Sequence, residues 1–193
     1  MARPSVVIRR VDKVGGDVVC ELWRKAREAG EIGADNAGRK ISDDSVLAAL
    51  ARPDTVAFIA SSDATPVGYV VVSDCTLNPF SDSGCVAVEQ LYVEPSARRQ
   101  GVAKALMGAV ATYADRHGAD QVACNVPSQG KDANRFFARL GFAPHVVRRL
   151  TSTAALHRKL AGSVEGGRYS LEQVLVRRRA ARVKAARQRL AAP

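Results

Sequence analysis

The stretch VEQLYVEPSARRQGVAKALM, residues 88–107, contains the end of a strand, a turn and the start of a helix. Pro95 ends the strand, because proline has no N–H for a sheet ladder. Gly101 has no Cβ, so it can adopt an unusual φ and lets a ligand approach the main chain. The N–H groups of residues 99–104 then become the unpaired donors of a helix N-terminus, at the positive end of its dipole.

This turn is suited to bind an anion such as a pyrophosphate through main-chain N–H groups. It lacks the Gly-Lys-Ser/Thr of a P-loop and the G-x-G-x-x-G of a dinucleotide fold. Without further information, an ordinary strand-to-helix turn with exposed arginines explains it equally well. The basic side chains that add charge here are Arg98, Arg99 and Lys104.

Hydrophobic periodicity and turn residues predict the elements on either side. We expect strands over 5–11, 55–61, 66–73, 85–95, 120–126 and 145–152, and helices over 17–31, 43–51, 101–117, 131–141 and 153–162. This order indicates an α/β (α+β) sheet with antiparallel early strands and a parallel crossover around the 101–117 helix.

Two motifs at a fitting separation resemble those of the GNAT superfamily of N-acetyltransferases. Arg98-x-x-Gly101-x-Ala103 resembles the family's [Arg/Gln]-x-x-Gly-x-[Gly/Ala] signature, and FFARLGF at 136–142 resembles its aromatic-x-x-x-Gly-Phe landmark. The resemblance covers about residues 5–150 and implies a GNAT-like mixed central sheet flanked by helices.

The resemblance also implies acetyl-CoA as co-substrate. Its pyrophosphate would bind the backbone of Arg99–Lys104, and its pantetheine would pair with Leu91–Val93 like an added strand. A bulge would separate this strand from 120–126, and the N–H of Leu91 would stabilise the thioester oxyanion. The cofactor-binding residues implied are Leu91, Tyr92, Val93, Arg98, Arg99, Gln100, Gly101, Val102, Ala103, Lys104 and Phe137.

Glu89 is the candidate base for the attacking amine, because period-2 alternation places it on the same face as Leu91 and Val93. A solvated surface carboxylate, with water removing the proton, is the alternative. Many relatives carry a tyrosine as general acid where this chain has Phe137. Another donor (Tyr92 and Cys124 by proximity alone), an unprotonated leaving thiolate, or binding without turnover remain open.

The resemblance also implies that the acceptor is a primary amine of a small molecule, a protein N-terminus or a lysine. The 31–41 loop, the 43–51 helix and the 74–84 loop should wall its site, and their acids are suited to attract a cation. Loop acids are also commonly just solvated. The acids concerned are Glu31, Asp35, Asp43, Asp44, Asp74 and Asp82.

Composition predicts a globular protein, with 47% apolar and 25% charged residues. The N-terminus has no apolar signal-peptide core and no stretch is long enough to cross a membrane, so we expect a cytoplasmic protein without a membrane partner. Four scattered cysteines without a C-x-x-C pair predict separate reduced thiols and no metal. They are Cys20, Cys75, Cys85 and Cys124.

The formal net charge of +10 lies entirely in residues 143–193, which hold twelve Lys and Arg against two acids. We therefore divide the chain into an acetyltransferase domain, 1–152, and a basic helical extension, 153–193, with a basic helix over 171–190. The extension has three interpretations: a nucleic-acid or ribosome contact, packing on the domain or on a homodimer partner, or a solvated tail. The alternative function is a non-catalytic acyl-CoA-binding regulator with such a tail.

Overall fold

A computed structural model describes residues 5–11, 15–31, 41–77, 80, 83–126 and 130–162. Within these ranges the chain forms five strands, five α-helices and one short 3₁₀ turn. The strands are β1 (Val6–Arg10), β2 (Thr55–Ser62), β3 (Thr65–Cys75), β4 (Gly84–Val93) and β5 (Ala119–Cys124). The helices are α1 (Gly16–Glu28), α2 (Asp43–Leu50), the 3₁₀ turn η1 (Pro95–Ala97), α3 (Val102–Arg116), α4 (Lys131–Arg139) and α5 (Thr153–Gly162).

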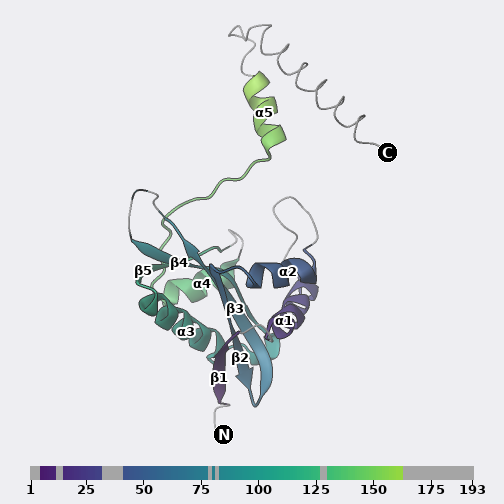
Figure 1. Cartoon of the computed structure of the whole chain (residues 1–193), viewed down its shortest axis with the longest axis vertical. Coiled ribbons are helices and arrows are strands. Elements are labelled where there is room, and N and C mark those ends of the chain that lie inside the picture. The colour runs from purple at the N-terminus through teal and green to yellow at the C-terminus, as the bar shows by residue number, and fades with distance from the viewer. Residues whose placement is uncertain are drawn as a thin grey trace, which may run out of the picture. The chain divides into compact units, whose positions relative to one another are not determined.

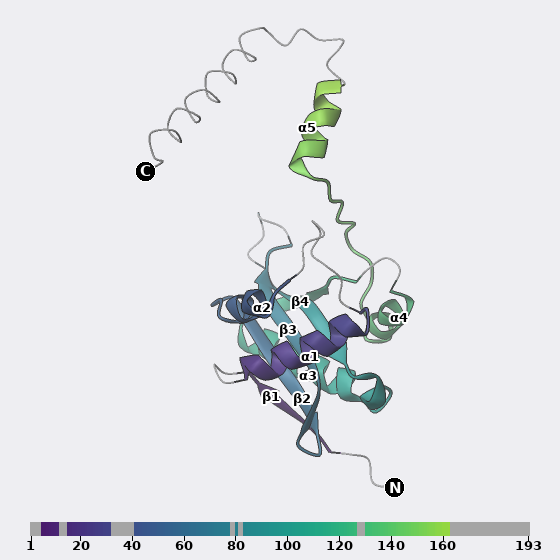
Figure 2. The same cartoon turned by 90° about the vertical axis from the view of Figure 1, so that its right-hand side faces the viewer.

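The five strands make one mixed sheet in the order β1-β2-β3-β4-β5. The pairs from β1 to β4 are antiparallel, while β4 and β5 are parallel and are connected through α3. Helices α1 and α2 cover one face of the sheet, and α3 and α4 cover the other (Figures 1 and 2). This confirms the predicted element order up to α4 and the predicted parallel crossover.

The two sheet faces carry separate apolar clusters, which explains why the central strands are nearly continuous apolar runs. On the α3 side, Val70, Leu106 and Val110 are fully buried. On the α1 side, Trp23 and Tyr69 are buried together with neighbouring residues of β2. Helices α1 and α3 stay in place because each covers a sheet face with its buried apolar stripe.

A hairpin joins β2 and β3, the strands expected over 55–61 and 66–73. Asp63 and Ala64 both have positive φ, at 49° and 64°. Two consecutive left-handed residues match the right-handed twist of the flanking strands. The hairpin therefore directs β3 back between β2 and β4, where it forms the centre of the sheet.

The strand predicted over 145–152 is wrong, because these residues form neither helix nor strand. Val146, Val147 and Leu150 are 73%, 80% and 66% exposed. Their β-branched composition favours a strand, but a strand also requires a partner for its backbone. The chain divides into two compact units, Met1–Pro144 and His145–Pro193, and α5 confirms the helix predicted at 153–162 within the second. The basic helix predicted over 171–190 lies outside the described residues.

The prediction of four separate thiols is also wrong, since Cys75 and Cys85 form a disulfide. They are directly opposite each other in the β3–β4 ladder, with Cα atoms 5.1 Å apart. This register belongs to the β3–β4 pairing and cannot be read from cysteine spacing. Cys20 and Cys124 are free thiols. Among the described helices, none is long and apolar enough to cross a membrane.

Candidate active site

Strand β4 contains a bulge at Glu89. Val88 pairs with Val72 on β3, and Gln90 pairs with the adjacent Val71, so Glu89 has no partner in the β3–β4 ladder. An extra residue of this kind bends the strand and redirects a side chain. The resemblance implied such a bulge near the end of this strand, and the structure has one.

The bulge also changes which residues of β4 face α3. Val86 and Val88 precede it and Leu91 and Val93 follow it, yet all four belong to or pack against the same apolar cluster. The period-2 alternation that placed Glu89 beside Leu91 is therefore interrupted at Glu89 itself. The position of the Glu89 side chain is therefore defined by its contacts and not by the alternation.

Strands β4 and β5 part at the same point. Their parallel pairing ends with Val88 opposite Cys124, whereas β4 continues to Val93. Beyond the last pair, a long backbone contact of 3.5 Å joins the N–H of Asn125 to the carbonyl of Val88. We call Val88, Glu89, Cys124 and Asn125 the β4–β5 fork.

The open edge of β4 beyond the fork presents main-chain polar groups. The N–H of Glu94 donates to Val67 on the β3 side, at 2.8 Å. Because successive residues of a strand point to opposite edges, the N–H groups of Leu91 and Val93 point away from β3. The carbonyl of Val93 follows this rule, since it accepts a bond from Arg98. Leu91 thus presents its N–H where β5 no longer pairs.

The turn before α3 has the geometry of an anion-binding site. Gly101 caps α3 in a left-handed conformation, with φ 89°, and makes no side-chain capping bond. A Cβ built on it meets nothing within 4 Å, so space lies open beside the backbone. Arg99 also has a positive φ, of 63°, which curls the preceding loop. Unpaired N–H groups beside open space are what a pyrophosphate needs.

Arg98 and Gln100 use their side chains within the protein. The Arg98 Nε donates to the Val93 carbonyl at 2.9 Å, and its Nη2 contacts the carboxylate of Glu31. The Gln100 Nε2 donates to the carbonyl of Ser96 at 2.9 Å. Both residues therefore shape the turn between β4 and α3, and the ligand-binding groups it offers are main-chain N–H groups.

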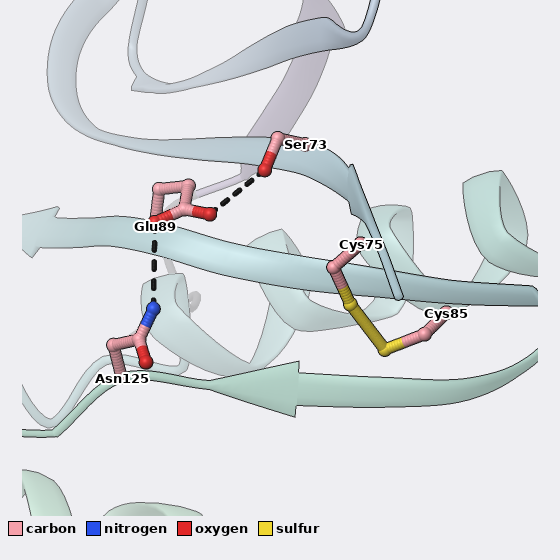
Figure 3. The surroundings of a disulfide bond; sticks show 5 residues. All are labelled: Ser73, Cys75, Cys85, Glu89 and Asn125. Carbon is pink, nitrogen blue, oxygen red and sulfur yellow. Dashed lines mark hydrogen bonds between the residues drawn. A yellow bond between two sulfur atoms is a disulfide. The ribbon is translucent and has the colours of Figure 1, made fainter. Parts of the chain in front are cut away.

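The carboxylate of Glu89 is held from both sides of β4 (Figure 3). The Ser73 hydroxyl on β3 donates to its Oε1 at 2.7 Å, and the Asn125 Nδ2 just beyond β5 donates to its Oε2 at 3.4 Å. The side chain is nevertheless exposed. Neither Ser73 nor Asn125 was singled out from the sequence. For each of them, the sequence offers one signal, a polar residue after a run of apolar strand residues. That pattern is too common to identify a functional site.

Phe137, at the position of the relatives' general acid, and the two residues considered as proton donors are placed differently. Phe137 is buried against the edges of the Phe136 and Phe142 rings, with centroids 5.2 Å apart in each pair. Burial raises the pKa of both Tyr92 and Cys124. Tyr92 lies in the apolar cluster on the α1 side, whereas Cys124 lies at the fork and packs on the α3-side cluster.

The acids expected near the acceptor site are largely engaged elsewhere. Glu31 pairs with Arg98, and Asp43 lies 3.5 Å from Arg24. Asp35 and Asp82 lie outside the described residues, as does most of the 31–41 loop. Within the described ranges, no group of three or more His, Cys, Asp or Glu side chains is arranged to hold a metal ion.

The family model described as "Acetyltransferase (GNAT) family" matches residues 19–142. The chain belongs to the GNAT acetyltransferase family. This stretch contains most of α1, the bulge, the fork and the turn before α3, so the features described above lie within the matched region.

One GNAT relative is an uncharacterized N-acetyltransferase of Methanocaldococcus jannaschii, 26% identical over 93 residues. That match covers 48% of this chain and 41% of the relative, so less than half of the relative's length is matched. Two solved GNAT structures share the fold. Aminoglycoside N-acetyltransferase AAC(6')-Iy in complex with CoA has a TM-score of 0.64 and 23% identity, with 78% of this chain and 96% of that one covered. The ribosomal-protein-alanine N-acetyltransferase of Brucella melitensis biovar Abortus 2308 has a TM-score of 0.62 and 19% identity, with 77% and 99% covered.

Proposed function

We propose that this GNAT protein transfers the acetyl group of acetyl-CoA to a primary amine by direct attack, without a covalent enzyme intermediate. The observation that carries the proposal is the β4–β5 fork. It sets an edge of β4 without a described strand partner, which carries the Leu91 N–H, two residues along the strand from Glu89. Membership of the family and the CoA-bound AAC(6')-Iy structure support acetyl-CoA as the acetyl donor.

The pyrophosphate of acetyl-CoA is proposed to bind the backbone of Arg99–Lys104. The left-handed Gly101, the open space beside it and the absence of a side-chain cap support this placement. Val102 and Ala103 contribute N–H groups of the first turn of α3, and the side chains of Arg99 and Lys104 add positive charge. Arg98 is proposed to act indirectly, by fastening the turn to the end of β4.

The pantetheine is proposed to lie along Leu91–Val93, with Tyr92 contributing only main chain because its side chain faces α1. Phe137 is proposed to pack beside it as an apolar wall. This places the thioester carbonyl at the Leu91 N–H, which would stabilise the oxyanion of the tetrahedral intermediate. Binding both reactants at one fixed point supplies much of the rate enhancement.

In the proposed reaction, a neutral amine attacks the thioester carbon, and a C–N bond replaces the C–S bond. Glu89 takes the proton released by the amine nitrogen, directly or through one water. The CoA leaves as a thiolate, which takes its proton from solvent. This route needs no hydroxyl at position 137, and the buried Phe137 has none to offer.

The test is to mix the protein with acetyl-CoA and a panel of primary amines and to measure free CoA thiol. The panel should contain an aminoglycoside, a polyamine, a lysine peptide and a peptide with a free N-terminus. We expect thiol release with at least one amine, and about a 100-fold lower kcat for Glu89→Gln with unchanged acetyl-CoA affinity. Binding of acetyl-CoA without release on any amine would contradict the proposal and indicate a regulator.

A further inference from the structure

The contacts of Glu89 come from two different strands of the site. Ser73 lies on β3 and Asn125 directly follows β5, so the carboxylate on β4 bridges the two neighbours of its own strand. Each carboxylate oxygen receives one donor, at 2.7 Å from the Ser73 hydroxyl and at 3.4 Å from the Asn125 amide. Figure 3 shows Glu89 between these two side chains.

The bulge makes these side-chain contacts important for the orientation of Glu89. A residue with a cross-strand partner is oriented by the ladder, but Glu89 has none on β3, and the pairing with β5 ends one residue before it. An exposed glutamate that is not held samples several rotamers, and fixing it in one of them costs conformational entropy. Ser73 and Asn125 supply the orientation that the backbone does not.

The arrangement leaves the carboxylate able to act as a base. A carboxylate has about four lone-pair positions, and two donors leave the others for an amine or a water. The nearby Arg52 does not compete for them, because its Nε and Nη2 donate to Asp54 at 3.0 Å and 2.6 Å. Glu89 is therefore held in place and is still accessible from solvent.

We propose that Ser73 and Asn125 are positioning residues for the base Glu89. The inference rests on the proposed acetyl transfer and adds two residues to its machinery. Because Asn125 follows β5 directly, it also fixes the distance between the base and the separated strand. Neither residue touches the reacting atoms in this account, so their removal should act on kcat and only through Glu89.

The test is a pair of double-mutant cycles measured by thiol release at saturating acetyl-CoA. We expect Ser73→Ala to lower kcat about 10-fold and Asn125→Ala about 3-fold, since the Ser73 bond to the charged group is shorter. The KM for acetyl-CoA should stay within about 2-fold in both. In a Glu89→Ala background, each change should alter the remaining kcat by less than about 2-fold.

Two further variants separate positioning from a general effect on the sheet. Ser73→Thr keeps the hydroxyl and should restore most of the lost kcat, and Ser62→Ala removes a serine hydroxyl at the far end of β2 and should leave kcat unchanged. If Glu89→Ala leaves no measurable transfer, rescue by Ser73→Thr decides the question. A lack of rescue would overturn the inference.

The inference is also overturned if Ser73→Ala and Asn125→Ala lower kcat equally with and without the Glu89 carboxylate, or if they raise the acetyl-CoA KM instead. In those cases acetyl transfer itself stands. A wild-type protein that binds acetyl-CoA but transfers to no amine would end both the proposed function and this inference. The two failures are therefore distinguishable in the same assay.

Discussion

The two halves of β4 differ in their strand partners. Gly84–Val88 pairs with β3 on one side and with β5 on the other, and is crosslinked to β3 by the Cys75–Cys85 disulfide. In Glu89–Val93, the bulged Glu89 has no partner on β3, and the residues after it pair with β3 alone among the described strands. We call these the closed half and the open half of β4.

The difference shows how one strand both stabilises a domain and serves as a site. In the closed half the strand has a neighbour on both edges, so side chains decide its energetics through burial. In the open half the edge away from β3 has no described strand partner, and we propose that it receives the pantetheine. A single extra residue at Glu89 separates the two, and the following predictions test whether the halves really differ in this way.

The largest effect is expected at the turn that accompanies the open half. Gly101→Glu should weaken acetyl-CoA binding by at least about 100-fold, because it puts bulk and negative charge where the pyrophosphate is proposed to bind. Gly101→Ala is the matched control. Both variants carry the same cost of a positive φ, about 1–2 kcal/mol, but alanine adds no charge. Calorimetric titration should show at most about a 10-fold loss of acetyl-CoA affinity for Gly101→Ala. Equal losses of affinity in both variants would show that the pyrophosphate does not bind at this turn.

In the closed half, removing the disulfide should lower the free energy of unfolding by about 3 kcal/mol, the value expected for a short closed loop. The Cys75→Ser/Cys85→Ser double variant and reduced wild type should give the same urea midpoint. Acetyl-CoA affinity should not change, because the crosslink lies on the other side of the bulge. If reductant left the urea midpoint of the wild-type protein unchanged, the Cys75–Cys85 disulfide would be contradicted.

Side-chain truncation should also distinguish the halves. Val86 is 1% exposed in the closed half, and Val86→Ala should cost about 2 kcal/mol of stability with kcat unchanged. Leu91 in the open half only packs against the edge of the same cluster. Leu91→Ala should cost less stability although it removes more carbon atoms. Urea denaturation of both variants measures the two losses of stability. A larger loss for Leu91→Ala than for Val86→Ala would mean that the open half belongs to the hydrophobic core.

The smallest effect concerns the free thiol at the fork. Burial raises the pKa of Cys124, so less thiolate is present at pH 8 than in an exposed cysteine. In a Cys20→Ser background, alkylation by iodoacetamide should be several-fold slower than for free cysteine and should still be accelerating above pH 9. Saturating acetyl-CoA should slow it further. Full reactivity at pH 8 would show that the fork is more open than described.

Much of the fold was predictable because local signals agreed with one another. The Pro95 and Gly101 turn, the apolar stripes of the helices and the order of strands all point to the same sheet. The failures lie where the outcome depends on partners distant in sequence. The strand expected over 145–152 has suitable residues but no described partner. The Cys75–Cys85 bond depends on the register of β3 against β4, which only the folded sheet defines.

The site shows the same division. The turn before α3 and the importance of Leu91 and Glu89 follow from a motif of adjacent residues. The position of the bulge does not follow from that motif. Because of the bulge, the regular alternation of side chains is interrupted at Glu89 itself. Ser73 and Asn125 were out of reach, because they meet Glu89 from 16 and 36 residues away. Contacts of that kind are created by topology and leave no local pattern.

The most direct test of the difference between the two halves is an amide NMR titration of the whole chain with acetyl-CoA. The account predicts the largest shifts for the N–H groups of Leu91, Val93 and residues 101–104. It predicts small shifts for the closed half, Val86 and Val88 included. Saturable binding that shifts the closed half and leaves Leu91 and Gly101 unmoved would contradict it.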